Sequence, residues 1–249
     1  MATKNKKAQK EPAAVDPNRV PTGIPGLDDL ITGGIEKESN VLVMGGPGSG
    51  KTTFLVQFLV QGALKYNEPG LFLTFEEQKE TLVKHMGNFG WDLNALEDEG
   101  MFTVITYKPH EVKKLLDEGG GMIWDSIHSI KAKRLAVDSL STYAMLFDTN
   151  YQMRESQLLL FDLLRKWNIT TLLSGEAQNA SLIRKFTGME YLTDGVILLH
   201  HPRQGNARVR ALEVLKLRGI GHSQKICPFE FIEGRGIEVY PDEDVFSEM

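Results

Sequence analysis

Residues 40–53 read Asn-Val-Leu-Val-Met-Gly-Gly-Pro-Gly-Ser-Gly-Lys-Thr-Thr, and this stretch constrains the fold more than any other. The apolar run 41–44 is typical of a buried parallel strand, and a helical pattern begins at Lys51. Between them, Gly45 and Gly50 bracket four residues and are followed by Lys-Thr, the spacing of a phosphate-binding loop. Glycines let consecutive backbone N–H groups face an anion, and the helix N-terminus adds partial positive charge. The stretch therefore predicts a site for a nucleoside triphosphate.

The residue types of this loop suggest the individual contacts. Lys51 can reach the β- and γ-phosphates, and the hydroxyl of Thr52 can bind Mg²⁺. The residues expected to bind the nucleotide here are Gly46, Pro47, Gly48, Ser49, Gly50, Lys51, Thr52 and Thr53. ATP and Mg²⁺ are the expected cofactors.

Length and composition set the broad class. The 249 residues suit one large α/β domain, and the net charge of −5 provides no general attraction to nucleic acid. Cys227 is the only cysteine in the sequence, so no internal disulfide can form, which suits a reducing cytoplasm. No apolar run reaches the length of a membrane span, and the N-terminus lacks the apolar segment of a signal peptide. We therefore expect a soluble, cytoplasmic protein without membrane contact.

Strand and helix patterns alternate along most of the chain, which predicts a mostly parallel sheet flanked by helices. The strands expected in this part are 41–44, 71–75, 102–107, 135–137 and 169–173. The helix after the loop carries an apolar stripe made of Phe54, Leu55, Phe58, Leu59, Gly62 and Ala63. Further helices are expected near 27–31 and 78–88, and Asn150 is expected to cap a longer one. The stretch 110–132 has a helical pattern that is interrupted by three glycines.

The pattern changes near the C-terminus. Four strand-like runs follow one another without a helix, which predicts antiparallel pairing: 196–201, 207–218, 226–232 and 236–240. We expect a disordered basic tail over 1–19, an ATPase domain over 20–241 and an acidic tail over 242–249.

Polar side chains follow or end four of the predicted parallel strands. Lys51 and Thr52 come just past the first, and Glu76, Asp138 and Ser174 end three others. Because the carboxyl ends of parallel strands meet at one edge of a sheet, we expect these side chains to converge on the loop. Asp138 is expected to hold Mg²⁺ indirectly, beside Thr52, and Glu76 to orient or deprotonate the attacking water. Glu77 is an alternative for that catalytic role.

Several segments together resemble the RecA superfamily. They are Thr-Gly-Ile-Pro-Gly-Leu-Asp at 22–28, the phosphate loop, Leu-Thr-Phe-Glu-Glu at 73–77 and Val-Asp-Ser at 137–139. The segment Leu-Lys-Leu-Arg-Gly-Ile-Gly-His at 215–222 makes the resemblance specifically KaiC-like. The resemblance covers about 20–241 and implies a single RecA-type ATPase core. It also implies assembly as a ring, expected to be a hexamer, with ATP bound between subunits.

Four basic residues share one face of a predicted strand at a period of two: Arg208, Arg210, Lys216 and Arg218. Leu215 and Leu217 are expected to point the other way. From the residues alone, a solvated basic face is the simpler interpretation. In KaiC-like proteins the residues matching Lys216 and Arg218 reach a neighbouring subunit's ATP, so the resemblance implies a catalytic and binding role across the subunit boundary. By the same resemblance, Leu217 and His222 are expected near the nucleotide.

One departure from the family bears on activity. The second domain of KaiC phosphorylates itself on adjacent Ser and Thr before an apolar-Thr-Asp turn. In this chain the turn is 192–194, and Glu190 and Tyr191 occupy the preceding pair. The chain is in this respect similar to KaiC's first domain, which hydrolyses ATP, so autokinase activity is not expected.

The sequence therefore predicts a slow P-loop ATPase whose subunits meet through their nucleotides, acting as a regulatory or signalling switch. The expected partner is a second copy of the chain, and an additional regulatory protein is compatible with this role. One alternative is a nucleic-acid motor or recombinase of the same superfamily, for which 177–190 offers only Arg184, Lys185 and Phe186 as basic or aromatic residues. Another alternative is an ATP-binding scaffold that barely hydrolyses.

Overall fold

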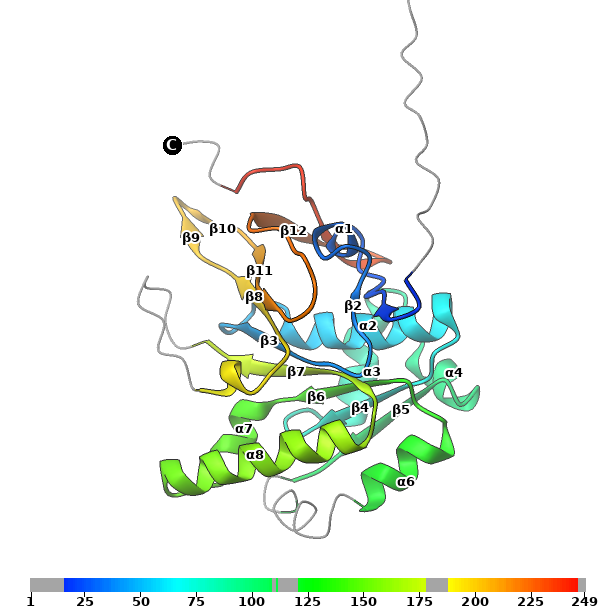
Figure 1. Cartoon of the computed structure of the whole chain (residues 1–249). Helices are drawn as coiled ribbons and strands as arrows, with labels where there is room; N and C mark the ends of the chain where they lie inside the picture. The colour runs from blue at the N-terminus through cyan, green and yellow to red at the C-terminus, as the bar shows by residue number, and fades with distance from the viewer. Residues whose placement is uncertain (1–15, 109–110, 112–120, 178–187, 246–249) are drawn as a thin grey trace, which may run out of the picture.

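A computed structural model describes residues 16–108, 111, 121–177 and 188–245 (Figure 1). Its main sheet has the strand order β13-β12-β11-β8-β3-β7-β6-β4-β5. The neighbouring strands that pair in parallel are β8 (Gly195–His200), β3 (Asn40–Gly45), β7 (Thr170–Glu176), β6 (Arg134–Asp138), β4 (Gly70–Thr74) and β5 (Phe102–Thr106). The sheet continues in antiparallel fashion through β11 (Ala211–Leu217), β12 (Ile226–Ile232) and β13 (Gly236–Val239). The expected α/β fold is confirmed.

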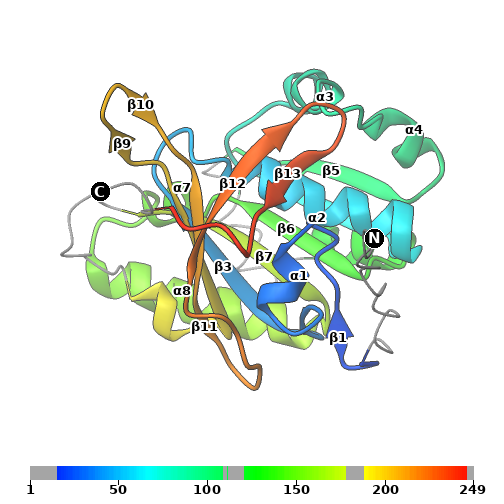
Figure 2. The same ribbon diagram turned by 90° about the horizontal axis from the view of Figure 1, so that it is seen from above.

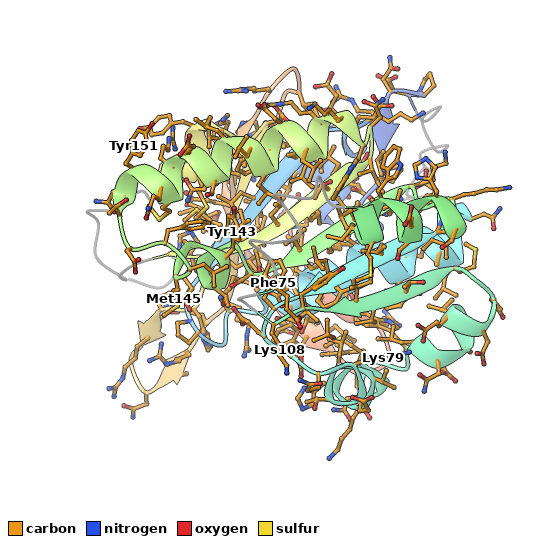
Figure 3. The ribbon with its side chains drawn as sticks, turned by 90° about the horizontal axis from the view of Figure 1, so that it is seen from below. Phe75, Lys79, Lys108, Tyr143, Met145 and Tyr151 are labelled. Carbon is orange, nitrogen blue, oxygen red and sulfur yellow. The ribbon has the colours of Figure 1, made fainter. Side chains whose placement is uncertain are left out.

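Helices cover both faces of this sheet (Figures 1 and 2). One face packs against α1 (Leu27–Leu30), α2 (Lys51–Tyr66), α3 (Lys79–Gly87) and α4 (Leu93–Asp98). The other packs against α6 (Gly121–Ser129), α7 (Leu140–Ala144) and α8 (Asn150–Lys166). On this second face Tyr143 lies inside the layer, whereas Met145 and Tyr151 project from it (Figure 3).

The central strand β3 shows why the sheet must be covered twice. All of its residues are buried, and successive side chains point to opposite faces. Val41 and Val43 belong to the core under α2, whereas Leu42 and Met44 belong to the core under α8. A run without polar alternation therefore places β3 in the middle of a three-layer structure.

Helix α2 is more buried than its apolar stripe predicts. Val56, Gln57, Val60 and Gln61, which lie outside the stripe, are buried as well. One reason is β13, which packs against α2, and another is the segment at Gly23, which lies against Gln61. The Gln57 side chain donates to the Ile237 carbonyl at 2.9 Å and accepts from its backbone N–H at 2.6 Å. Gln57 thus replaces the strand partner that β13 lacks on its outer side.

The segment 22–28 has a structural role. The carboxylate of Asp28 accepts from the backbone and the hydroxyl of Thr22 at 2.8 and 2.7 Å, and from the backbone of Gly23 at 3.1 Å. Burial raises the pKa of Asp28, and these hydrogen bonds oppose the shift. The carboxylate therefore fastens the N-terminal segment to α1.

Three local expectations need correction. Thr149, not Asn150, caps α8, because its hydroxyl accepts from the Gln152 N–H at 3.2 Å. The run 207–218 is not one strand, because a hairpin of β9 (Arg203–Gln204) and β10 (Ala207–Arg208) precedes β11. A register shift between Val214 and Lys216 also breaks the period of two, which leaves Leu215 exposed while Leu217 is buried.

Other predictions fall partly or wholly outside the residues that the structure describes. Arg19, the last residue of the expected basic tail, belongs to β1 (Arg19–Val20), whose backbone pairs with β2 (Ile35–Glu36). The lysines of that tail lie outside the described residues. The same holds for 112–120 of the glycine-interrupted stretch and for Arg184, Lys185 and Phe186. Among the described helices, none is long and apolar enough to cross a membrane.

A buried arginine fixes how closely α2 approaches β6. The Arg134 guanidinium is fully buried, donates to the Phe58 carbonyl at 2.8 Å and pairs with Glu68 at 2.7 Å. The central carbon of the guanidinium, Cζ, lies 4.5 Å from the centre of the Phe58 ring. A Cβ at Gly62 would lie 2.5 Å from Cδ of Arg134. Glycine at 62 therefore makes room for this ion pair.

We predict that Gly62→Ala lowers the free energy of unfolding by about 1–3 kcal/mol, as overpacking does, although alanine is the better helix former. Gly87 of α3 is the matched control, because no atom lies within 4 Å of the position of its Cβ. Gly87→Ala should leave stability unchanged or raise it by up to about 1 kcal/mol. Urea unfolding without nucleotide measures both, and equal effects would contradict the role given to Arg134.

Candidate nucleotide site

The loop between β3 and α2 has the backbone of an anion site. Gly48 and Gly50 adopt positive φ values of 70° and 100°, which glycine tolerates best. A Cβ at Gly45 would lie 2.3 Å from the Ser49 hydroxyl oxygen, so the loop closes tightly on the end of β3. The helix begins at Lys51 without a side-chain cap, and its first backbone N–H groups remain available for a ligand.

The ammonium group of Lys51 lies over this loop. Its Nζ donates to the carbonyl oxygens of Gly45 and Gly46 at 2.9 and 3.2 Å. These contacts keep the charge at the mouth of the loop, where a triphosphate would meet it. The contact of Lys51 with phosphate stays a prediction that this position allows.

Thr52 and Asp138 meet across the first turn of α2 and the end of β6. The Thr52 hydroxyl donates to Oδ2 of Asp138 at 2.7 Å, and the Ser174 hydroxyl donates to the other carboxylate oxygen. Burial raises the pKa of Asp138, and the hydrogen bonds from Ser174 and Thr52 counteract it. A divalent cation beside this buried carboxylate would favour its charged form.

This pair fits Mg²⁺. Because the Thr52 hydroxyl donates a hydrogen bond to Asp138, the lone pairs of its oxygen are left for a cation. The atoms available as metal ligands are hard oxygens, which Mg²⁺ prefers. Among the described residues, no group of three or more His, Cys, Asp and Glu side chains converges to hold a metal by itself. An ion here would complete its shell with water and phosphate oxygens, as Mg²⁺ does.

The two carboxylates after β4 have different surroundings. Thr74 of β4 pairs with Asp138 of β6. Glu76, two residues after Thr74, therefore emerges beside the hydrogen-bonded pair of Thr52 and Asp138. The Glu76 carboxylate accepts from the hydroxyls of Ser139 and Thr142, the second at 2.5 Å. The Glu77 carboxylate instead lies 2.7 Å from Nδ1 of His85 on α3. The geometry therefore places Glu76 beside Asp138 and holds Glu77 against α3.

Sequence reasoning missed Ser139 and Thr142 as the residues that hold Glu76. The signal was present, because Ser139 caps a helix whose third residue is Thr142. The Ser139 hydroxyl accepts from the Thr142 N–H at 3.3 Å, as in an N-cap. Because Ser139 directly follows Asp138 at the end of β6, its hydroxyl lies at the same edge of the sheet as the Asp138 carboxylate.

A second group lines the loop from the β8 and β12 side. A Cβ at Gly50 would lie 2.7 Å from the Phe231 ring, and the Arg210 guanidinium lies 4.6 Å from the centre of that ring. His201 lies next to Gly48. Burial and the nearby Arg210 and Arg208 lower the pKa of His201. No motif marks these residues, because the pairing of β11 and β12 brings them to the loop.

Lys216 and Arg218 lie at the opposite edge of the sheet. Leu217 pairs with Gly195 at the start of β8, level with Val41, whereas the loop follows Gly45. The separation is about 15–20 Å along the strand, beyond the reach of either side chain. The shared face expected with Arg208 and Arg210 is therefore wrong, because the bulge and the length of β11 separate the two pairs.

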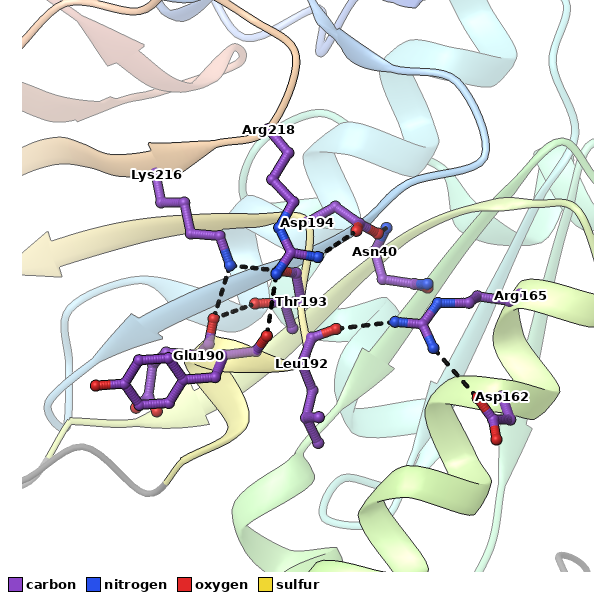
Figure 4. A network of polar contacts seen from close by, with 10 residues as sticks. Asn40, Asp162, Arg165, Glu190, Leu192, Thr193, Asp194, Lys216 and Arg218 are labelled. Carbon is purple, nitrogen blue, oxygen red and sulfur yellow. Dashed lines mark hydrogen bonds and ion pairs between the residues drawn. The ribbon is translucent and has the colours of Figure 1, made fainter.

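The two cations contact the segment before β8 (Figure 4). Lys216 Nζ donates to the Glu190 carbonyl at 2.9 Å, and Arg218 lies 3.4 Å from Asp194. Burial lowers the pKa of Lys216, and the nearby Arg218 adds to the effect. The Leu217 side chain is buried, which leaves only its backbone for a ligand.

His222 lies on the turn after β11, beside the end of α1. The neighbouring Gly221 carbonyl accepts from Thr32 at 3.2 Å, and the Ser223 N–H donates to the Leu30 carbonyl at 2.8 Å. His222 is therefore at the same edge as Arg218 and does not approach its own phosphate loop.

Comparisons with known proteins agree with this geometry. The family model "ATPase: KaiC" matches residues 20–244. The chain is 35% identical over 227 residues to the circadian clock oscillator protein KaiC of Parathermosynechococcus lividus, covering 88% of this chain and 42% of that protein. It thus spans less than half the length of that relative. It is 34% identical to UPF0273 protein MJ1359 of Methanocaldococcus jannaschii, covering 90% of this chain and 97% of that protein.

A solved structure has the same fold over nearly its whole length. The crystal structure of KaiC-like protein PH0186 from Pyrococcus horikoshii superimposes with a TM-score of 0.80 at 37% identity. The match covers 90% of this chain and 99% of that one. With the phosphate loop, the strand-end carboxylates and these matches together, the chain belongs to the KaiC family of RecA-type ATPase domains.

Proposed function

We propose that this chain is a slow ATPase that assembles as a ring, expected to be a hexamer, and acts as a regulatory switch with ATP at each subunit interface. One observation carries the proposal. The loop, Thr52, Asp138 and Glu76 lie at one edge of the sheet, and Lys216 and Arg218 lie at the other. Identical subunits packed head to tail would bring the two edges together, and such contacts close into rings.

Each residue then has a defined task. The loop and Lys51 bind the β- and γ-phosphates, and Thr52 and Asp138 hold Mg²⁺, which when bound neutralises phosphate charge. Glu76, oriented by Ser139 and Thr142, positions the attacking water and accepts its proton. Lys216 and Arg218 of a neighbouring subunit supply positive charge to the γ-phosphate.

Glu76→Gln keeps the shape of the side chain and removes the basic carboxylate. We predict unchanged ATP binding and hydrolysis reduced by at least about tenfold. Lys51→Ala, in contrast, should lose both binding and turnover, because it lacks the phosphate contact. Equilibrium ATP binding and phosphate release with Mg²⁺ measure these effects.

Glu77→Gln is the matched comparison, since it changes the adjacent carboxylate that His85 holds. A large loss in Glu77→Gln with none in Glu76→Gln would mean that Glu77 is the catalytic carboxylate. Wild-type protein that binds ATP without measurable turnover would instead identify a scaffold.

Arg218→Ala should fold, bind ATP through Lys51, hydrolyse it at least about tenfold more slowly and assemble less readily. Mixing Arg218→Ala with Glu76→Gln subunits should restore activity, because mixed interfaces combine an intact carboxylate with an intact arginine. Phosphate release and native mass with ATP and Mg²⁺ provide the measurements. If subunits exchange and activity stays at the level of either variant, action across the interface is excluded.

We also expect no stoichiometric autophosphorylation, because Glu190 is buried and no adjacent Ser-Thr pair precedes 192–194. Incubation with labelled ATP followed by peptide mapping tests this. Label approaching one phosphate per chain on Thr187, Tyr191 or Thr193 would show an autokinase instead.

A further inference from the structure

The segment 188–193, which contains the short 3-10 turn η1 (Met189–Tyr191), is surrounded by positive side chains. We call it the carbonyl turn, because five of its backbone carbonyl oxygens accept hydrogen bonds from cations. The bonds are Arg154 to Gly188 at 2.7 Å, Lys216 to Glu190 at 2.9 Å and to Thr193 at 2.5 Å, Arg218 to Tyr191 at 3.2 Å, and Arg165 to Leu192 at 3.2 Å.

These cations come from two sides. Lys216 and Arg218 reach the carbonyl turn from the end of β11 and the residue after it, and Arg165 reaches it from the end of α8 (Figure 4). Arg154, on the first half of α8, holds the beginning of the turn at Gly188. The turn is thus fixed to α8 on one side and presents its remaining carbonyl oxygens to β11 on the other.

The absence of a side chain at Gly188 lets the Arg154 guanidinium come close to the backbone. Gly188 has a φ of 87°, and a Cβ there would lie 3.0 Å from Nη1 of Arg154. A side chain would therefore be strained by the backbone and would push the guanidinium away. A hydrogen bond from a charged donor at 2.7 Å is among the stronger kinds of polar contact.

Long cationic side chains are flexible, and a fixed location carries an entropic cost. Two donors of the Lys216 ammonium point to the Glu190 and Thr193 carbonyls. The Arg218 guanidinium lies between the Tyr191 carbonyl and the Asp194 carboxylate. Both cations thus occupy a defined place before any phosphate arrives, and preorganised charge is what stabilises a transition state most effectively.

We propose that Arg154 and Arg165 are positioning residues for ATP hydrolysis in the neighbouring subunit. They hold the carbonyl turn, and the turn holds Lys216 and Arg218 where the neighbour's γ-phosphate meets them. The inference rests on the proposed action across the interface. Arg154 contributes more than Arg165 to holding the carbonyl turn. Its hydrogen bond to the turn is 2.7 Å long, against 3.2 Å for Arg165. The Arg165 side chain is also 49% exposed and forms an ion pair with Asp162.

Mixed rings test the direction of this effect. The base mixture combines Glu76→Gln subunits, which donate intact cations, with Arg218→Ala subunits, which contain an intact carboxylate. Adding Arg154→Met to the Glu76→Gln subunit should lower the restored kcat by about threefold or more, in the range of couplings through neighbouring residues. Adding it to the Arg218→Ala subunit should change the restored kcat by less than about twofold.

Several comparisons separate positioning from general damage. Arg154→Lys in the cation-donating subunit should recover part of the rate, because an ammonium can still donate to the Gly188 carbonyl. Lys166→Met, which changes an exposed cation of the same helix, should have no effect. The KM for ATP should stay unchanged while kcat falls, because the phosphate loop is intact.

Equal losses from both placements of Arg154→Met, or no loss from either, would overturn the inference while the restored activity of the base mixture still supports the proposed function. A base mixture without restored activity would reject the proposed function, and the positioning role with it. Thermal unfolding and native mass of each variant establish that subunits are folded and assembled in every comparison.

Discussion

The hydrogen bond between Thr52 and Asp138 is the contact on which the site depends. It joins the first turn of α2 to the end of β6 at 2.7 Å, and it buries a carboxylate next to the phosphate loop. Burial of such a charge is unfavourable unless its oxygens are hydrogen-bonded, which Thr52 and Ser174 achieve from two other elements. One carboxylate therefore fixes α2, β6 and β7 relative to one another. The same arrangement brings together the Thr52 and Asp138 oxygens that would hold a divalent cation.

The parallel register explains why Glu76 belongs to this site. Thr74 of β4 lies beside Asp138, so the residues after both strands emerge at one edge. Adjacent carboxylates repel each other, and the negative charge of Glu76 contributes to the raised pKa of Asp138. The hydroxyls of Ser139 and Thr142 hold Glu76 in place without adding charge. A divalent cation at this position would offset the negative charge of both carboxylates and of a bound triphosphate.

The opposite edge is organised mainly by backbone carbonyls, with the Asp194 carboxylate beside Arg218. The carbonyl turn receives side chains from α8 and β11, which are far apart in sequence. Lys216 donates to the Glu190 and Thr193 carbonyls, which carry no net charge, whereas Arg218 is shared between the Tyr191 carbonyl and the Asp194 carboxylate. In the proposed ring, Lys216 and the exposed guanidinium of Arg218 would face the neighbour's phosphate. Each catalytic site of the proposed ring would then combine the loop edge of one subunit with the Lys216 and Arg218 edge of its neighbour.

The sequence by itself determined the phosphate loop, the parallel core and the polar residues at the strand ends, because these follow from local spacing and from the period of apolar residues. Its period of two failed along β11, since a bulge forms through pairing with β8, which local spacing does not encode. Only the tertiary structure separated Glu76 from Glu77, through Ser139 and Thr142 on one side and His85 on the other. It also placed Arg154 and Arg165 against the carbonyl turn and Phe231 against Gly50. Contacts of this kind depend on strand order and helix packing, which bring together residues that no local pattern connects.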